Sequence, residues 1–585
     1  MKKILAVFIV LATVFAATLA YADDSKIAPE LRNYPANQQA QVIVQYAPGT
    51  QINCSGILGL VFCVVNDVLK LGGTILAQIP IINGIVAVVD GNGIVSLSNE
   101  SNVVYISSDR TLAPTLSNAA PAINAEFAWQ SGYTGAGIGV AVIDSGVNSH
   151  PDLNGLLLSR VVYQQSFVPG NSSAADQYGH GTHIAGLIAG DGLSSTGPLY
   201  SKSFKGIAPG ANIVNLRVLD ANGATTDSAV IAAIARAIAL KSTYNIRVIN
   251  LSMGRGVFEG YKLDPLCQAV ERAWKNGIVV VVAAGNNGRY QPTSGYVTVN
   301  SPANDPYVLT VGAMKPMGTP QRTDDLMASY SSKGPTVLDA VVKPDLVAPG
   351  NLLVSLAAPN STLYMQNPAN RVPYNFYVNG GSKSSSTSYF TLSGTSMAAG
   401  VVSGVVADLL QKSPSLTPDQ VKARLMKTAW KSLPAYSSVT DPATGITYTD
   451  QDDVFTVGAG YVDVEAALVS TDVAKGTAMS PLATYDSNTK QIWMKDDPSS
   501  VWNTSSTWSN AAVWGTAQFV APVAGSASSS TNVYGSNVLW GTNVLWGTNV
   551  LWGTNVLWGT NVLWGTNVLW GTNVLWGTSV AGGEN

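Results

Sequence analysis

The sequence predicts an α/β protein whose central region is a mostly parallel sheet with helices on both faces. Short apolar runs rich in β-branched residues recur between about residues 120 and 470, as expected of strands buried on both faces. Helical patterns separate these runs, and such alternation is typical of parallel sheets. The clearest runs are residues 137–144, 211–220, 246–254, 277–285 and 307–314, and the clearest helix is 227–245.

The chain begins with the pattern of a secretory signal peptide. Two lysines at positions 2 and 3 precede an apolar stretch, residues 4–20, and a small-residue Ala-Tyr-Ala motif follows at 20–22. We therefore expect removal of residues 1–22, export, and a secreted location, with or without attachment to the cell surface. An uncleaved membrane anchor is the alternative. Polar residues interrupt the later apolar stretch at 56–89, so a second membrane span is not expected.

Residues 23–111 predict a small α+β unit ahead of the central region. The segments 40–46 and 83–91 have the apolar pattern of strands. A stretch rich in Pro, Ala and Ser follows at 107–126, as is typical of a link between domains.

Composition excludes some classes of protein. The chain of 585 residues has a net charge of −3, only 11% charged residues and no basic runs, so nucleic acid is not an expected partner. No Cys/His spacing suggests structural zinc. Export permits a disulfide, for which Cys54 and Cys63 are the local pair. The third cysteine, Cys267, lies in a helical pattern and is expected to be a buried apolar residue.

The C-terminal part of the chain has a different character. Residues 473–536 are interpreted as a linker or a small accessory region, and seven copies of NVLWGT follow at 537–578. A short fixed period predicts a repeat architecture. Val and Trp share one face of each unit, and Gly-Thr-Asn has turn chemistry. A β-meander and a β-solenoid both fit, so we expect an all-β or irregular tail.

Side chains that could take part in catalysis or binding follow several of the apolar runs. Parallel sheets place ligands at the carboxyl ends of their strands. Asp144 ends the run 137–144, and Asn286 follows the run 277–285. An isolated buried carboxylate is costly, which makes Asp144 hard to explain as core filler. Ser396 opens an apolar helix after another strand-like segment, where backbone N–H groups and the helix dipole favour negative charge.

Serine, histidine and a buried carboxylate are the parts of a nucleophilic acyl-transfer site. An amide donor such as Asn286, with the Ser396 N–H, suits the oxyanion of such a reaction. Two of the three histidines, His180 and His183, lie three residues apart. By themselves they fit a metal pair, a catalytic base with a bystander, or two structural residues. His-x-x-His is a weak zinc signal, and no Glu pattern completes it.

Four segments occur in order along the chain: VAVIDSGV at 140–147, HGTHIAG at 180–186, AAGNNG at 283–288 and GTSMAAG at 394–400. They resemble the signature blocks of subtilisin-like (subtilase) serine proteases. Shorter matches flank them, among them SHPDL, GIAPGANI, NLSMG and VVKPDLVAPG, and the similarity extends over about residues 120–470. The resemblance implies a subtilisin-like fold for a catalytic domain at 112–472, and a serine endopeptidase that acts on polypeptides through an acyl-enzyme.

The resemblance also assigns roles residue by residue. It implies a catalytic triad of Asp144, His180 and Ser396, with Asn286 as the oxyanion donor. The first histidine of the HGTH motif is the family's base, so His183 is expected to be a packed, hydrogen-bonded neighbour one helical turn away. Metal-dependent hydrolysis is correspondingly disfavoured, and no metal ligands are assigned.

Substrate-binding residues follow from the same resemblance. NLSMG is similar to the family's substrate-aligning strand, which implies that Ser252, Met253 and Gly254 hold an extended peptide through main-chain hydrogen bonds. Asn300 falls near the base of the family's first specificity pocket. An ordinary loop asparagine is the alternative interpretation of Asn300.

The sequence departs from the family pattern in two places. Residues 397–401 read Met-Ala-Ala-Gly-Val where the family has Met-Ala-x-Pro-His, and we expect the helix to persist. A polar insertion at 355–390 is interpreted as a lid-like or surface loop. The family needs no cofactor for its chemistry, but structural calcium is common in it, and Asp152 matches a frequent ligand position. His150 is expected in a surface turn.

Residues 23–111 resemble the inhibitory propeptide of subtilases. This implies a folding assistant and temporary inhibitor that the enzyme itself removes by cleavage between about Asp109 and Ala125. A permanent accessory domain is the alternative.

A second function, from a different class, is surface adhesion or self-assembly through the repeats, with the protease as a processing device. A pseudoenzyme is disfavoured because all four catalytic positions are filled. An esterase or lipase is disfavoured because the G-x-S-x-G elbow is absent.

Overall fold

The computed structural model describes residues 23–515 apart from short internal gaps. The predicted signal peptide at 1–22 and the repeats at 537–578 lie outside the described residues. The chain divides into two compact units, residues 1–108 and 109–585, which are described separately. The internal gaps are residues 29–30, 33, 49, 51–53, 58–59, 64–67, 69–70, 110, 115–121, 155–158, 318–320, 442–443, 487–490 and 504.

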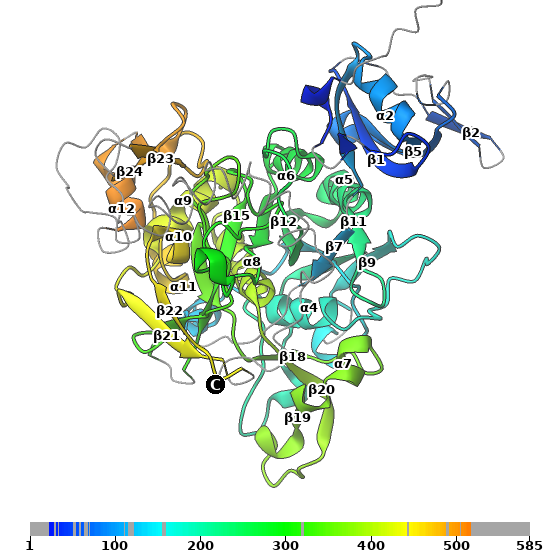
Figure 1. Ribbon diagram of the computed structural model, residues 1–585. Coiled ribbons are helices and arrows are strands. Elements are labelled where there is room, and N and C mark those ends of the chain that lie inside the picture. The colour runs from blue at the N-terminus through cyan, green and yellow to red at the C-terminus, as the bar shows by residue number, and fades with distance from the viewer. Residues whose placement is uncertain are drawn as a thin grey trace, which may run out of the picture. The chain divides into compact units, whose positions relative to one another are not determined.

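The first unit contains an antiparallel sheet with the helix α2 packed on it (Figure 1). The strands lie in the order β4-β5-β1-β6, and apolar side chains of β1 and β5 share a buried cluster with Ile94 and Leu97 of α2. Both strands predicted in this region are present. The elements are β1 (Gln39–Tyr46), β4 (Thr74–Ile79), β5 (Gly84–Asp90), α2 (Gly91–Ser98), β6 (Val103–Ser108) and the short turns η1 (Asp24–Lys26) and η3 (Pro80–Ile82).

A separate hairpin in the first unit joins β2 (Cys54–Ile57) to β3 (Leu60–Cys63). Its register puts Cys54 directly opposite Cys63. Opposite residues of an antiparallel pair have the Cα spacing that a disulfide needs. The predicted disulfide is therefore compatible with the backbone, and it stays a prediction.

The second unit is built on an eight-stranded sheet that is parallel except for one edge strand. The order is β16-β15-β14-β12-β8-β10-β9, and β17 pairs with β15. All five predicted runs contribute strands to this sheet, which confirms the α/β fold class. The strands are β8 (Gly139–Asp144), β9 (Val161–Ser166), β10 (Asn212–Arg217), β12 (Ile246–Leu251), β14 (Val279–Ala283), β15 (Leu309–Lys315), β16 (Leu326–Met327) and β17 (Leu346–Pro349).

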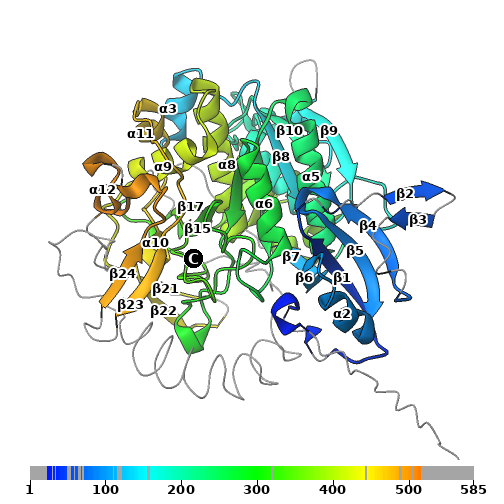
Figure 2. The ribbon, with the colours of Figure 1, turned by 90° about the horizontal axis from the view of Figure 1, so that it is seen from above.

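Helices cover both faces of this sheet. α5 (Asp227–Tyr244) and α6 (Pro265–Lys275) pack together on one face (Figure 2). α4 (Gly181–Ala189) and α8 (Thr395–Lys412) pack together on the other. The first sixteen residues of α8 are buried, as its apolar composition predicts. Gly404 permits the close approach, because a Cβ there would lie 2.6 Å from the Cβ of Ile207. The departure at 397–401 leaves this helix unbroken.

The stretch after the sheet belongs to the same compact unit. Ala478, Met494 and Trp502 share a buried cluster with Ala423 and Met426 of α9. Of the described residues, no helix is long and apolar enough to cross a membrane. The remaining elements here are α3 (Ala125–Gln130), α9 (Pro418–Thr428), β21 (Tyr436–Thr440), β22 (Thr447–Gln451), α10 (Val454–Val457), α11 (Val464–Val469), β23 (Leu482–Asp486), β24 (Gln491–Lys495) and α12 (Asn510–Trp514).

Candidate active site

Asp144 and His180 form a buried pair at the carboxyl end of the sheet. Asp144 is the last residue of β8, and His180 directly precedes α4. The His180 Nδ1 lies 2.8 Å from Asp144 Oδ1 and 3.0 Å from Oδ2, and both side chains are fully buried. The Ser145 N–H donates to Asp144 Oδ1 at 2.7 Å. A carboxylate in this place holds the imidazole in one orientation and stabilises its protonated form.

A second buried carboxylate, Asp176, shapes the loop that leads to His180. It accepts hydrogen bonds from the backbone N–H groups of Gly179 (2.6 Å) and Thr182 (2.8 Å), and from Ser145 Oγ (2.8 Å). Burial raises the pKa of Asp176, while these hydrogen bonds oppose the rise. Sequence reasoning did not select Asp176. The signal was present, because an Asp a few residues before a helix is a typical partner for loop and first-turn N–H groups.

Ser396 is the second residue of α8 and is tied to the end of β12. Its Oγ donates to the carbonyl of Ser252 at 3.0 Å, and Ser252 Oγ donates to the carbonyl of Ser396 at 2.9 Å. Asn250 Nδ2 donates to Ser252 Oγ at 2.8 Å and so extends this network into the sheet. The strand before Ser396 does not belong to the parallel sheet, contrary to expectation. It is β20 (Ser385–Leu392), which pairs antiparallel with β18 (Leu353–Leu356).

Asn286 is joined to the residue that precedes Ser396. Its Oδ1 accepts from the Thr395 N–H at 2.9 Å and from Thr395 Oγ1 at 3.0 Å. The Gly285 N–H in turn donates to Thr395 Oγ1 at 3.1 Å. The acceptor end of the amide is therefore occupied, which leaves Nδ2 as the end that can donate to a substrate oxygen. Asn286 is only partly buried, so part of it is accessible to solvent.

Met253 and Gly254 form a short edge strand, β13 (Met253–Gly254), beside the chain's own segment β7 (Thr111–Pro114). Met253 pairs with Pro114 and Gly254 with Ala113, in antiparallel register. The other edge of β7 pairs antiparallel with β11 (Thr225–Thr226). The segment β7 thus lies between the two edge strands β11 and β13, and β13 begins at the residue after Ser252.

Asn300 lies against the same group of residues. A Cβ on Gly254 would come within 3.0 Å of Asn300 Cβ, and a Cβ on Gly285 within 2.9 Å of Asn300 Nδ2. Both glycines are therefore required for this packing. The Asn300 N–H donates to the carbonyl of Ala284 at 3.1 Å. The structure thus pairs Asp144 with His180, and it gathers Ser396, Ser252, Asn286, Gly254 and Asn300 in a second group, while the roles predicted for these residues stay predictions.

His183 has a structural position in the first turn of α4. It is fully buried, and its Nε2 lies 3.1 Å from the carbonyl oxygens of both Leu353 in β18 and Phe390 in β20. Because carbonyls only accept, Nε2 carries the proton. Burial lowers the pKa of His183 well below its usual value, and the nearby His180 lowers it further. His183 is thus the packed, hydrogen-bonded neighbour that was predicted.

His150 differs from its prediction in exposure. Its Nδ1 accepts from the Asp152 N–H at 3.1 Å at the start of the turn η4 (Pro151–Leu153), so the predicted turn is present. The side chain is nevertheless buried, because its Nε2 bonds to the carbonyl of Ser388 in β20 at 3.0 Å. The contact with β20 could not be anticipated from the local pattern.

The insertion at 355–390 is an ordered substructure that projects from the second unit (Figure 1). Its base is the β18–β20 hairpin that His183 and His150 contact. Ser355 Oγ also donates to the carbonyl of His183 at 2.8 Å. Beyond the hairpin lie α7 (Thr362–Gln366) and β19 (Arg371–Pro373) with the short turns η7 (Pro368–Asn370) and η8 (Tyr374–Phe376).

Asp152 does not fit the calcium role that the resemblance implied. Its Oδ1 accepts from the Ser194 N–H at 2.8 Å, and its Oδ2 accepts from Tyr389 OH at 2.6 Å. Protein donors thus occupy both carboxylate oxygens. Over the described part of the chain, no group of three or more His, Cys, Asp or Glu residues could hold a metal ion.

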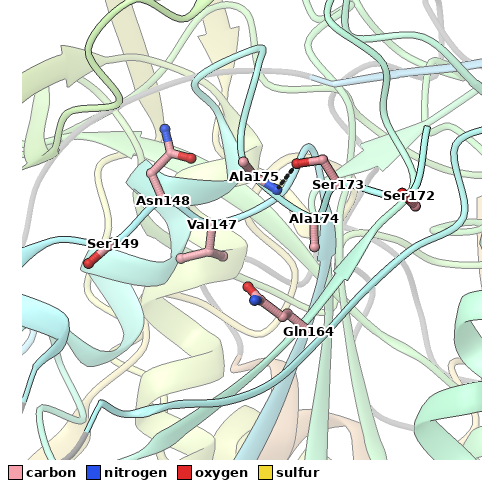
Figure 3. A pocket seen from close by; sticks show the side chains of 8 residues that line it. All are labelled: Val147, Asn148, Ser149, Gln164, Ser172, Ser173, Ala174 and Ala175. Atoms are coloured by element: carbon pink, nitrogen blue, oxygen red, sulfur yellow. Dashed lines mark hydrogen bonds between the residues drawn. The ribbon is translucent and has the colours of Figure 1, made fainter.

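A hollow of about 410 Å³ lies beside the Asp144 and His180 loops (Figure 3). None of the triad candidates lines it. Within it, the Ala175 N–H donates to Ser173 Oγ at 3.3 Å. The triad candidates therefore lie outside this hollow, whose lining is residues 147–149, Gln164 and residues 172–175.

Comparison with known proteins decides the family. Residues 135–460, more than half of the chain, match the model of the subtilase family. The chain belongs to the subtilase family. It is therefore a serine endopeptidase, which agrees with the expectation from its four signature blocks.

Two curated subtilases illustrate the similarity. Serine protease AprX of Bacillus subtilis is 37% identical over 340 residues, which cover 56% of this chain and 70% of AprX. Subtilisin E of the same species is 34% identical over 364 residues, or 61% of this chain and 78% of subtilisin E.

A solved structure supports the fold. It is fervidolysin from Fervidobacterium pennivorans, described as a keratinolytic enzyme related to subtilisin. The TM-score is 0.54 at 23% sequence identity, and the match covers 77% of this chain and 63% of that one. The subtilisin-like α/β fold predicted for the central region is thus confirmed.

Proposed function

We propose that this subtilase is a secreted endopeptidase that uses Asp144, His180 and Ser396 as its catalytic triad and Asn286 as its oxyanion donor. The observation that carries the proposal is the double contact of Asn286 Oδ1 with Thr395, directly before Ser396. With Oδ1 held by Thr395, Nδ2 is the end of the amide that would donate to the charge developing on a carbonyl bound at Ser396. The buried Asp144–His180 pair supplies an oriented base at the start of α4, the helix that packs against α8.

The reaction follows from these groups. His180 Nε2 takes the Ser396 Oγ proton while Oγ attacks the peptide carbonyl. The tetrahedral oxyanion accepts from Asn286 Nδ2 and the Ser396 N–H. Its collapse breaks the C–N bond, and His180 returns the proton to the departing amine. Water then hydrolyses the acyl-enzyme by the same steps. No cofactor takes part.

The substrate is a polypeptide bound in extended conformation. Support comes from the pairing of β7 with β13 on one edge and β11 on the other. Such pairing uses main-chain hydrogen bonds and leaves selectivity to side-chain pockets. Met253 and Gly254 align the peptide in this proposal. Asn300, packed against Gly254, contributes to the first specificity pocket.

We further propose that the enzyme is made as a self-processing precursor with residues 23–111 as its propeptide. β7 runs toward Ser252, which contacts Ser396, so self-cleavage is expected in the segment after Pro114 and before Ala125. Asp109, which lies two residues before β7, is held in place because its Oδ1 accepts from the Ser228 N–H at 2.6 Å in the first turn of α5. The propeptide would act as an intramolecular inhibitor until cleavage.

The second candidate function concerns the tail. Residues 501–585 carry a single charged residue, Glu584, and seven tryptophan-bearing repeats. Low charge with high β-propensity favours association with a surface or with like chains. Deleting residues 516–585 should then reduce surface retention or oligomerisation, while hydrolysis of soluble protein continues.

The test of the main proposal compares residues 23–585 as wild type and as Ser396→Ala. Chain length is followed by mass spectrometry, together with digestion of an unstructured protein. We expect the wild type to lose its N-terminal segment and to digest, and Ser396→Ala to remain full-length and inert. Equal shortening and digestion by both proteins would contradict Ser396 as the nucleophile.

A further inference from the structure

The insertion makes one set of contacts that the mechanism above does not use. Thr362, the first residue of α7, joins two loops of the second unit. Its N–H donates to the carbonyl of Gln177 at 3.0 Å, and its Oγ1 donates to the carbonyl of Ala221 at 2.6 Å. The next N–H, of Leu363, donates to the carbonyl of Tyr178 at 2.9 Å.

Both loops lead directly to parts of the substrate site. Gln177 and Tyr178 come just before His180. Ala221 lies in a tight turn in which Asp220 Oδ1 accepts from the N–H groups of Asn222 (2.8 Å) and Ala224 (2.9 Å). This turn ends at β11, the edge strand that pairs with Thr111 and Leu112 of β7. A shift of the turn would therefore displace one of the two edges against which a peptide lies.

Tyr178 completes the connection between the two loops. A Cβ on Gly223 would lie 2.6 Å from the ring carbon Cζ of Tyr178, so the ring lies flat against the turn before β11. Burial raises the pKa of Tyr178 to about 12, helped by the charges of Asp144, Asp176 and Asp220. The ring thus lies between the histidine loop and the β11 turn. A side chain at Gly223 would force this ring to move, and the φ of +78° at Gly223 also favours glycine.

Several hydrogen bonds hold the insertion that contains Thr362 in a fixed position. His183 and His150 fasten its base through three carbonyls of β18 and β20, and Tyr389 OH is bonded to the buried Asp152. The Thr362 hydroxyl is the one side-chain group among these contacts that reaches the β11 turn. Through this hydrogen bond, the position of the insertion influences the position of the edge strand β11.

We propose that Thr362 is a positioning residue for extended substrates. It holds the turn before β11 against the loop before His180, and so keeps β11 in place to pair with peptide residues distant from the cleaved bond. The proposal rests on the peptidase function proposed above. It assigns to the insertion a role in binding long peptides.

The register of β7 supplies the test. Residues 113 and 114 pair with β13, and residues 111 and 112 pair with β11. A blocked peptide anilide with two residues before the cleaved bond would reach β13 only. One with five residues would reach β11 as well. The two anilides are compared on the matured enzyme and on its Thr362→Val and Thr362→Ser variants.

Thr362→Val keeps the side-chain shape and removes the hydroxyl. We expect KM for the five-residue anilide to rise about fivefold with little change in kcat, because a lost hydrogen bond of this kind weakens ground state and transition state alike. The two-residue anilide should change by less than about twofold. Thr362→Ser restores the hydroxyl and should return KM to the wild-type value.

Two results would overturn the proposal. Equal losses on both anilides would show that Thr362 acts through His180 or through stability alone, and no loss on either would show that β11 does not need it. Thermal melting of each variant confirms that it is folded at the assay temperature. Failure of the peptidase function itself would appear separately, as a wild type that cleaves neither anilide.

Discussion

The candidate active site and the insertion at 355–390 meet at one helix, α4, and they are built in different ways. His180 at its start faces Asp144, and its partners come from short motifs at loop and strand ends. His183, one turn later, bonds to Leu353 and Phe390 in the hairpin of the insertion. Two histidines in one motif thus serve chemistry and architecture. Their hydrogen-bond partners, and not their own identity, make the difference.

This comparison predicts that variants of the site lower catalysis without unfolding, and that variants of the insertion lower stability with little effect on the chemical step. The largest expected effect is that of Ser396→Ala. Loss of the nucleophile should lower kcat by roughly 10⁶-fold, since triad members act as a unit. Stopped assays at high enzyme concentration measure the residual activity of the variant. A loss below tenfold would remove Ser396 from the mechanism.

Asn286→Ala is the next largest change. Loss of one oxyanion donor should lower kcat by about 10²–10³-fold with KM nearly unchanged, because the bond forms only in the transition state. Steady-state kinetics on a peptide anilide checks this. The adjacent exposed Asn287 offers a matched control, and Asn287→Ala should keep most of the activity. Equal effects of the two substitutions would contradict the assignment.

Tyr389→Phe tests the insertion side. The substitution removes the hydroxyl that donates to Asp152 Oδ2 and leaves a buried carboxylate oxygen without this partner. We expect the free energy of unfolding to fall by about 1–3 kcal/mol. Denaturant melts measure it, with kcat on a short anilide expected to stay within about twofold. A large loss of kcat at unchanged stability would mean that the insertion takes part in the chemistry.

The smallest effect is a pH dependence of stability at His183. Burial lowers its pKa in the folded state below the ordinary value of 6.5, so the unfolded chain binds the proton more strongly. The stability that depends on neutral His183 is fully present above pH 6.5. As the pH falls below this value, the free energy of unfolding decreases by about 1.4 kcal/mol per pH unit. Melting temperatures of wild type and His183→Gln between pH 7 and 5 test this. The melting temperature of the variant should fall less steeply with decreasing pH than that of the wild type. Parallel curves for the two proteins would contradict the prediction.

Much of the site was predictable from the residues because its parts depend on short stretches of chain. Asp144 ends a run of β-branched residues, and Ser396 opens an apolar helix, so local pattern places both at element ends. The resemblance to subtilases then paired them with His180 and Asn286. Asp176 was overlooked although its place just before a helix was a signal for bonds to first-turn N–H groups, and its bond to Ser145 Oγ beside Asp144 exists only in the folded chain.

The sequence by itself determined the parallel α/β architecture, the order of the strands along the chain and the identity of the candidate reactive residues. Hydrophobic periodicity and motif spacing are properties of neighbouring residues, so they are readable without coordinates. Only the tertiary structure decided that the insertion is an ordered support, that His150 is buried, and that both oxygens of Asp152 have protein partners. Those outcomes depend on hydrogen bonds between distant segments, such as that of Thr362 with Gln177, 185 residues apart. No local pattern encodes such partners, because they are chosen when the elements pack.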